Sequence, residues 1–268
     1  MLNRKSFILF ALLLAALFFV FTGCQDAAPE GDGSLQRVLD EGVLVVVGSG
    51  GYPPFNFYGE DDPDTPVGFD VDTGKAIAER LGVELVYETS DWDGLPDGLR
   101  AGRYDAILGS MADTEARREI VSFTIPYYYS GAQLIVREDS GITGPEDVEG
   151  LDIGVITGET YVDDAINLGA TDVHYAEVNT ILLEVLGGRI DGMITDRLVA
   201  IRGMEEIARG EELMLAGELI RTENVAIALR QEDVELREKI TEILEELHAD
   251  GTMTEISMRW HGVDITKP

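Results

Sequence analysis

Short apolar segments with the composition of β-strands alternate along this chain with segments whose apolar residues recur at helical spacing. This alternation is typical of α/β domains, in which helices cover a sheet. Gly82 and Gly169 directly follow two of the expected helices, where glycine commonly ends a helix. The expected helices are Asp72–Leu81, Thr160–Leu168, Val234–Ala249 and Thr252–Trp260, and the expected strands are Val43–Gly48, Val83–Glu88, Tyr104–Gly109, Asp152–Thr157, Gly192–Thr195 and Val225–Arg230.

A different pattern opens the chain. An unbroken apolar run from Phe7 to Phe21 follows Asn3-Arg4-Lys5 and ends at Thr22-Gly23-Cys24. A membrane span needs about 20 apolar residues, so residues 1–23 are predicted to be an export signal. The segment resembles a bacterial lipoprotein box, which implies that Cys24 becomes the lipidated first residue of the mature protein. The alternative is an ordinary secretory signal with an incidental cysteine. Residues 24–34 are then a tether that is anchored to the membrane.

The rest of the chain, from residue 35, is long enough for two domains of about 100 to 150 residues each. Its charge narrows the choice of partners, because 51 acidic and 20 basic residues give a formal net charge of −31. Nucleic acid is excluded as a partner, since binding it requires a basic face. The acidic residues are spread along the chain, which favours a solvated surface of the halophilic type over an acidic tail or a cation site.

Four expected strands end in small or polar residues: Gly48-Ser49, Gly109-Ser110, Thr157-Gly158 and Thr195-Asp196. In open α/β sheets, ligands bind beyond the carboxyl ends of the strands, where the N-termini of helices offer unpaired N–H groups. Turn formation alone would explain any single one of these ends. Together, the four ends predict a ligand site at this edge of the sheet.

The most specific motif is Gly68-Phe69-Asp70-Val71-Asp72 with the helix that follows it to Leu81-Gly82, although Thr73 replaces the usual apolar residue. Other motifs follow in order: Tyr52-Pro53-Pro54-Phe55, Trp92-Asp93-Gly94-Leu95, Gly102-Arg103-Tyr104-Asp105-Ala106, Thr114-Glu115-Ala116-Arg117, Phe123-Thr124-Ile125-Pro126-Tyr127-Tyr128, Gly188-Arg189-Ile190-Asp191 and Asp250-Gly251-Thr252 before Trp260. In this order and spacing they resemble the bacterial extracellular solute-binding proteins of the polar amino-acid type.

The resemblance implies an α/β periplasmic-binding-protein fold of type II, with two discontinuous lobes joined by two hinge strands. Lobe 1 would comprise residues 35–136 and 223–268, and lobe 2 residues 137–222. The implied function is to bind an amino acid between the lobes for an ABC permease, as an extracytoplasmic, lipid-anchored monomer. No enzymatic activity, cofactor or metal is expected.

An amino-acid zwitterion needs a bidentate donor for its carboxylate and an acid for its ammonium, because either charge is costly to bury unpaired. The resemblance assigns the first role to Arg117, three residues after Thr114, and the second to Asp196. Without the resemblance, Arg117 would be interpreted as an exposed helical arginine and Asp196 as a helix N-cap. Thr160, at the start of a helix, is expected to add donors to the carboxylate.

Further contacts are assigned around this pair. The resemblance gives Ser110 and Ala112 backbone contacts, although Ala112 lacks the hydroxyl that many relatives carry there. Tyr52 and Trp92 are placed where relatives sandwich the ligand side chain. Ser49 stands where several relatives have an acid for a basic side chain. Its neutrality argues against lysine or arginine as a strongly preferred ligand, unless Glu159 or Asp93 compensates.

Two other functions share parts of this pattern. A periplasmic cyclohexadienyl or arogenate dehydratase has the same fold, and Glu159 is the one candidate for the proton-donating acid that such a lyase needs. A sensor module of a kinase or of a cell-wall lytic enzyme is the third candidate. The histidines His174, His248 and His261 have no Ser, Cys or acid at the spacing of a known motif, and no Cys/His group suggests a metal.

Overall fold

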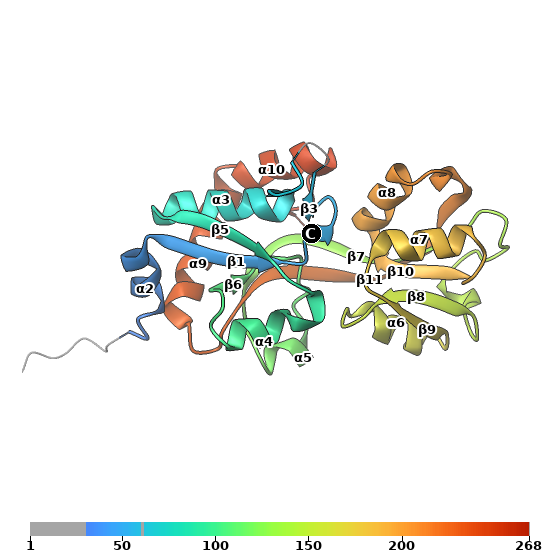
Figure 1. Cartoon of the computed structure of the whole chain (residues 1–268), viewed down its shortest axis with the longest axis horizontal. Coiled ribbons are helices and arrows are strands. Elements are labelled where there is room, and N and C mark those ends of the chain that lie inside the picture. The colour runs from blue at the N-terminus through green and yellow to red at the C-terminus, as the bar shows by residue number, and fades with distance from the viewer. Residues whose placement is uncertain (1–30, 60–61, 268) are drawn as a thin grey trace, which may run out of the picture. The chain divides into compact units, whose positions relative to one another are not determined.

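The computed structural model describes residues 31–59 and 62–267 (Figure 1). The predicted export signal, the lipidation site Cys24 and most of the tether lie outside these residues. The residues from Asp32 onward form one compact unit.

An eight-stranded sheet organises this unit, in the order β5-β1-β6-β11-β7-β10-β8-β9. The two central strands, β11 and β7, pair with each other and connect the group β5-β1-β6 with the group β10-β8-β9. The end of β11 pairs with β6 in one group, and the end of β7 pairs with β10 in the other. The bounds are β1 Val43–Gly48, β5 Glu84–Thr89, β6 Ala106–Ile107, β7 Ser122–Arg137, β8 Asp152–Ile156, β9 Thr171–Tyr175, β10 Gly192–Asp196 and β11 Leu213–Leu229.

The two long strands are where the sequence-based elements were wrong or incomplete. The expected Val225–Arg230 is only the end of β11, and neither β7 nor β9 was expected. Pro126 interrupts the apolar pattern of β7, and it lies where the pairing of β7 with β11 shifts register. A proline inside a strand is tolerated at such an irregularity because the ladder hydrogen bond is already missing there. The expected strand Tyr104–Gly109 shortens to two residues.

A small sheet and the helices complete the fold. The strands β2 (Gly51–Tyr52), β3 (Asn56–Tyr58) and β4 (Pro66–Val67) form a three-stranded sheet in this order, which positions Tyr52. Figure 1 shows α3 and α4 on opposite sides of the strands β5, β1 and β6, and α7 and α6 on opposite sides of β10 and β8. The helices are α2 Ser34–Glu41, α3 Phe69–Leu81, α4 Leu95–Arg100, α5 Glu115–Arg118, α6 Tyr161–Asn167, α7 Val178–Leu186, α8 Arg197–Glu206, α9 Val234–Ala249 and α10 Thr252–His261.

The four expected helices are present, with α9 at the predicted bounds. Helix α3 begins three residues earlier than expected, because Phe69 and Asp70 already have helical geometry. Gly82 ends it in the left-handed conformation at φ 74°, and its N–H donates to the carbonyls of Ala78 and Glu79. This is the C-cap that the sequence predicted, since glycine adopts positive φ without a steric cost.

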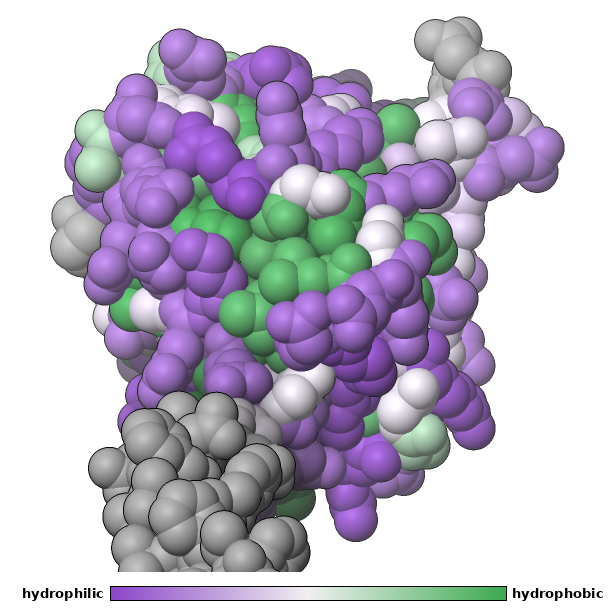
Figure 2. Space-filling view, turned by 90° about the vertical axis from the view of Figure 1, so that its left-hand side faces the viewer, coloured by the Kyte–Doolittle hydropathy of each residue, from purple (hydrophilic) through white to green (hydrophobic). Residues whose placement is uncertain are grey.

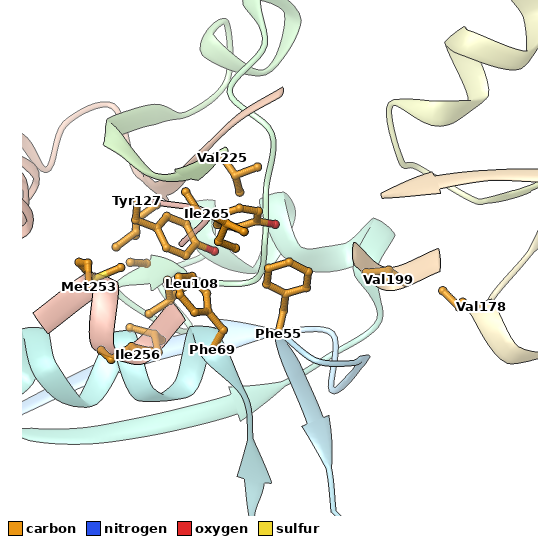
Figure 3. Close-up of a cluster of buried hydrophobic side chains, with 14 of the residues drawn as sticks. Phe55, Phe69, Leu108, Tyr127, Val178, Val199, Val225, Met253, Ile256 and Ile265 are labelled. Atoms are coloured by element: carbon orange, nitrogen blue, oxygen red, sulfur yellow. The ribbon is translucent and has the colours of Figure 1, made fainter. Parts of the chain in front are cut away.

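An aromatic cluster anchors the start of α3 to the sheet. Phe55 and Phe69 are fully buried, and their rings pack against Tyr128 at centroid distances of 4.8 Å and 5.6 Å. Figure 3 shows Phe55, Phe69 and Tyr127 together with Leu108, which comes from the segment after β6. Because Asp70 follows Phe69, this packing fixes the position of the Asp70 carboxylate beneath two of the strand ends.

The surface of the described residues is mainly hydrophilic (Figure 2). Figure 2 shows one face on which hydrophilic side chains surround a limited hydrophobic area. No helix in residues 31–59 and 62–267 is long and apolar enough to cross a membrane. Exposed carboxylates pair with several arginines; Arg80, for example, lies 3.2 Å from Glu246 and 2.5 Å from Asp250. Such exposed pairs are screened by salt, and the halophilic character of the surface stays a prediction.

Candidate ligand-binding site

A cavity of about 660 Å³ lies beyond the carboxyl ends of the strands β1, β5, β8 and β9. Two of the four strand ends expected to form a site contribute to it, those of β1 and β8. Its lining residues are Ser49, Gly50, Gly51, Tyr52, Asp91, Trp92, Asp93, Ile156, Thr157, Glu159, His174, Tyr175, Ala176, Glu177 and Val178. The lining therefore includes Ser49, Tyr52, Trp92 and Glu159 of the residues selected from the sequence.

The charge of this lining is strongly negative. It contains four carboxylates, those of Asp91, Asp93, Glu159 and Glu177, and no lysine or arginine. His174 also lines the cavity, and its Nε2 lies 2.7 Å from the Asp172 carboxylate. The cavity therefore favours positively charged groups and disfavours anions.

Arg117 is not among the lining residues, but it packs against Trp92, which is, and its backbone is fixed by Thr114. The Thr114 Oγ1 accepts a hydrogen bond from the Arg117 N–H at 3.2 Å, which caps α5. The guanidinium donates to the Ala112 carbonyl at 3.0 Å and to the Gly158 carbonyl at 3.4 Å. Its carbon lies 5.5 Å from the centre of the Trp92 ring. Burial lowers the pKa of Arg117, which reflects the cost of holding this cation out of water.

Arg118 has a different partner, outside this site. Its Nε and Nη2 donate to the Asp113 carboxylate at 2.6 Å and 2.5 Å. Its side chain remains 63% exposed. The two adjacent arginines therefore have different environments, and Arg118 provides a matched control for Arg117.

Asp196 is buried at the end of β10, where it also caps the next helix. Its Oδ1 accepts hydrogen bonds from the backbone N–H groups of Leu198 at 2.7 Å and Val199 at 3.3 Å. The N-cap role that the sequence left open is therefore real. Burial, together with the negative charge of Glu223, raises the pKa of Asp196 to about 7. A cation placed beside this carboxylate would favour its ionised form.

The Thr160 hydroxyl is already used within the protein, which corrects the expectation of a free side-chain donor. It donates to the Glu223 Oε1 at 3.0 Å and accepts from the Arg221 Nη2 at 2.7 Å. The hydroxyl of Tyr161 donates to the Glu223 Oε2 at 2.8 Å, and Arg221 also contacts Asp164 at 2.8 Å. This buried network joins the start of α6 to β11.

Ser110 is likewise held from within. Its Oγ donates to the Asp70 Oδ2 at 3.0 Å, and its N–H donates to the Tyr127 hydroxyl at 3.1 Å. Tyr127 in turn donates to the Asp70 Oδ1 at 2.7 Å. The side chain of Asn56 donates to the Asp70 Oδ2 at 2.7 Å, and its Oδ1 accepts from the N–H of Gly50 at 2.9 Å.

Asp70 therefore connects two loops at the strand ends. It holds Ser110 directly and, through Asn56, the segment from Ser49 to Gly50; the Ser49 hydroxyl also donates to the Asn56 Oδ1 at 3.2 Å. Burial raises the pKa of Asp70 to about 7 although three donors oppose the rise. Ala112 is also buried, and its carbonyl is the acceptor for Arg117.

The charges that act on Tyr52 and Tyr161 show which acids lie near the cavity. Burial raises the pKa of Tyr52 well above its usual value, and the negative charges of Glu159, Asp196 and Glu223 raise it further. The same three acids raise the pKa of Tyr161 after burial. Glu159 and Asp196 therefore act on the same space as Tyr52. Within the described residues, no group of three or more His, Cys, Asp or Glu side chains could hold a metal ion.

Sequence reasoning missed Glu223, Arg221, Asp70 and Asn56 as parts of the site. Asp70 carried the one available signal, because it lies inside the most specific motif. Glu223 and Arg221 had none, since they meet Thr160 across more than 60 positions of the chain.

The fold and the cavity at the strand ends define a two-lobed ligand-binding protein. The model of the bacterial extracellular solute-binding proteins, family 3, matches residues 44–263. The chain belongs to this family. The sequence-based predictions of family and of a two-lobe α/β periplasmic-binding-protein fold are confirmed. The family is described by solute binding outside the cell, so this chain is an extracytoplasmic solute-binding protein.

Several known proteins are similar over most of the chain. The L-cystine-binding protein TcyJ of Escherichia coli (strain K12) is 31% identical over 240 residues, which cover 88% of this chain and 89% of that protein. A mutant of ArgBP from T. maritima has a TM-score of 0.79 and 31% identity, covering 85% of this chain and 99% of that one. AncCDT-1, an ancestral amino acid-binding protein described as a precursor of cyclohexadienyl dehydratase, has a TM-score of 0.78 and 27% identity, with coverages of 85% and 99%.

Proposed function

We propose that this protein captures an amino acid between its two lobes and delivers it to an ABC permease. One observation carries the proposal. Arg117, a half-buried guanidinium on α5, and Asp196, a buried carboxylate at the end of β10, both act on the pKa of Glu159, which burial raises first of all. A zwitterion needs this combination, because its two charges must both be paired when water is excluded. The names of TcyJ and AncCDT-1, which describe amino-acid binding, support the same ligand class.

The proposed roles follow the charges of the ligand. Arg117 binds the carboxylate after exchanging its bonds to backbone carbonyls for a bidentate pair. Asp196 binds the ammonium. Tyr52 and Trp92 contact the side chain, and Ser49 lines the same wall. Ser110, Ala112 and Thr160 contribute through their backbone, because the hydroxyls of Ser110 and Thr160 are engaged elsewhere.

We also propose the lobe division that the resemblance implies, with residues 35–136 and 223–268 in lobe 1 and residues 137–222 in lobe 2. The pairing of Gly131 with Thr222 and of Ala132 with Arg221 supports a crossing of two adjacent strands between the lobes. Ligand contacts from both lobes would then favour the closed arrangement, because only that arrangement makes all of them. Because both lobes belong to one chain, we propose that the protein binds its ligand as a monomer.

One observation favours the dehydratase alternative. Burial and the charge of Glu223 raise the pKa of Glu159 to about 8, so this acid could hold a proton at neutral pH. Incubation with prephenate or arogenate distinguishes the two functions. Binding alone predicts no phenylpyruvate or phenylalanine, whereas release of either product would replace the proposal.

A thermal-shift screen against the proteinogenic amino acids tests the proposed function. We expect at least one amino acid to raise the unfolding temperature, because a ligand at 100 times its Kd stabilises the folded state by about 2.7 kcal/mol. The assay is run at high salt, because salt weakens the repulsion that follows from the net charge of −31. If none of the amino acids stabilises a correctly folded sample, amino-acid binding is rejected.

We further propose that the protein is attached to the membrane through a lipid on Cys24. Cys24→Ala is expected to move it from the membrane fraction to the soluble fraction of the cells, because one cysteine supplies the acceptor for the lipid. Fractionation and immunoblotting measure this shift, with Ala27→Gly in the tether as the control. Equal membrane retention of both variants would show that lipidation is not the anchor.

A further inference from the structure

We propose that Glu159 makes this site selective for an amino acid whose side chain carries a net positive charge, such as arginine, lysine or ornithine. The inference rests on the proposed function and specifies its ligand. It concerns Glu159 because this acid lines the cavity, whereas Ser49, which also lines it, carries no charge.

Glu159 is held in the cavity without a partner for one of its oxygens. Its Oε2 is buried and has no hydrogen-bond partner among the described residues. Arg117 does not supply one, since its Nη1 and Nη2 donate to the carbonyls of Ala112 and Gly158. A buried carboxylate without a partner is costly. A ligand cation would remove that cost.

The electrostatic surroundings agree with this geometry. Burial and the negative charge of Glu223 raise the pKa of Glu159 to about 8, and the positive charge of Arg117 only partly opposes the rise. A neutral ligand side chain could donate a hydrogen bond to the buried Oε2, but it would bring no charge to offset the burial of the carboxylate. A cationic side chain would stabilise the ionised form of Glu159 and gain binding energy from it.

The rest of the lining suits the same class of side chain. Trp92 and Tyr52 present aromatic rings to the cavity, and aromatic faces attract guanidinium and ammonium groups. Trp92 already holds such a group, because the Arg117 guanidinium lies 5.5 Å from its ring centre. Asp91, Asp93 and Glu177 are exposed, so solvent screens their charges more than that of Glu159.

Arginine and citrulline provide the sharpest comparison, because they have nearly the same shape and differ in side-chain charge. Isothermal titration calorimetry on the detergent-solubilised full chain at pH 8 measures both affinities. We expect arginine to bind at least about tenfold more tightly than citrulline. Glu159→Gln is expected to weaken arginine binding about 10- to 100-fold, as for the loss of one partner of a close charge pair. Citrulline binding should change by less than about threefold.

Glu149→Gln is the matched control, since it removes the same charge from an exposed position of the chain outside the cavity. It should leave both affinities unchanged. Equal binding of arginine and citrulline by the wild type, or an unchanged ratio in Glu159→Gln, overturns the inference while amino-acid binding stands. A wild type that binds no amino acid overturns the proposed function itself.

Discussion

Arg117→Ala is expected to weaken the binding of any amino acid by at least about 30-fold. The substitution leaves the ligand carboxylate without its bidentate donor, and the loss of one partner of a buried charge pair costs about 2 to 5 kcal/mol. Each 1.4 kcal/mol corresponds to about a tenfold change in Kd. Calorimetry with the best ligand from the amino-acid screen measures the effect.

The adjacent Arg118 makes this experiment specific. Arg118→Ala removes the same side chain one position away, but it breaks only the pair between the exposed Arg118 and Asp113, outside the site. We expect its ligand affinity to remain within about twofold of wild type. Arg117→Lys should recover only part of the loss, because an ammonium cannot form two parallel hydrogen bonds. Similar effects of Arg117→Ala and Arg118→Ala would remove Arg117 from the site.

Folding should survive the loss of Arg117. Burial lowers the pKa of this arginine, so holding its charge in place costs stability instead of adding to it. Its two hydrogen bonds go to backbone carbonyls that water can reach once the side chain is removed. A loss of binding in this variant therefore reports on the ligand contact.

Local patterns in the sequence were sufficient for the helices and the short parallel strands. Val43–Gly48 and Val234–Ala249 have the bounds that periodicity predicted. Each of these elements is set by its own residues and by one apolar face. The long strands β7 and β11 are different, because their pairing joins residues about 90 positions apart and contains register shifts. Periodicity within a window cannot detect such pairing.

The candidate site shows the same division between local and distant information. Trp92 and Tyr52 follow strand ends, and the strand ends were visible in the sequence. The state of each polar group was not visible, because it depends on partners from distant segments. Thr160 illustrates this, since Glu223 and Arg221 of β11 occupy its hydroxyl. Ser110 is a second example, since its hydroxyl donates a hydrogen bond to Asp70.

These networks also explain why the site is acidic and yet ordered. Asp70 and Glu223 each accept several hydrogen bonds from side chains, which hold their carboxylates in place. Glu159 lacks such a partner for one oxygen, and the Oδ1 of Asp196 accepts hydrogen bonds from two backbone N–H groups. Glu159 therefore has an oxygen that is available to a positive charge on a ligand.

Asp196→Asn is expected to weaken citrulline binding about tenfold or more at pH 8 and to reduce its dependence on pH between pH 6 and pH 8. In the wild type, burial raises the pKa of Asp196 to about 7, so most of these carboxyls are protonated at pH 6 and ionised at pH 8. The ligand ammonium binds the ionised form. Wild-type affinity should therefore rise about tenfold between pH 6 and pH 8 and then level off, which calorimetry at pH 6, 7 and 8 measures.

Asparagine is the appropriate substitution because its side-chain oxygen can still accept the hydrogen bonds that cap α8. Asp196→Ala removes both the charge and the cap, and it should also lower the unfolding temperature, since losing an N-cap costs about 1 kcal/mol. Citrulline is used because its neutral side chain adds no charge beside Glu159, whose pKa burial raises to about 8, so the difference in slope between the wild type and Asp196→Asn reports on Asp196. A wild-type affinity that is flat or falls with rising pH, or an Asp196→Asn variant that keeps the slope, would exclude Asp196 as the partner of the ammonium.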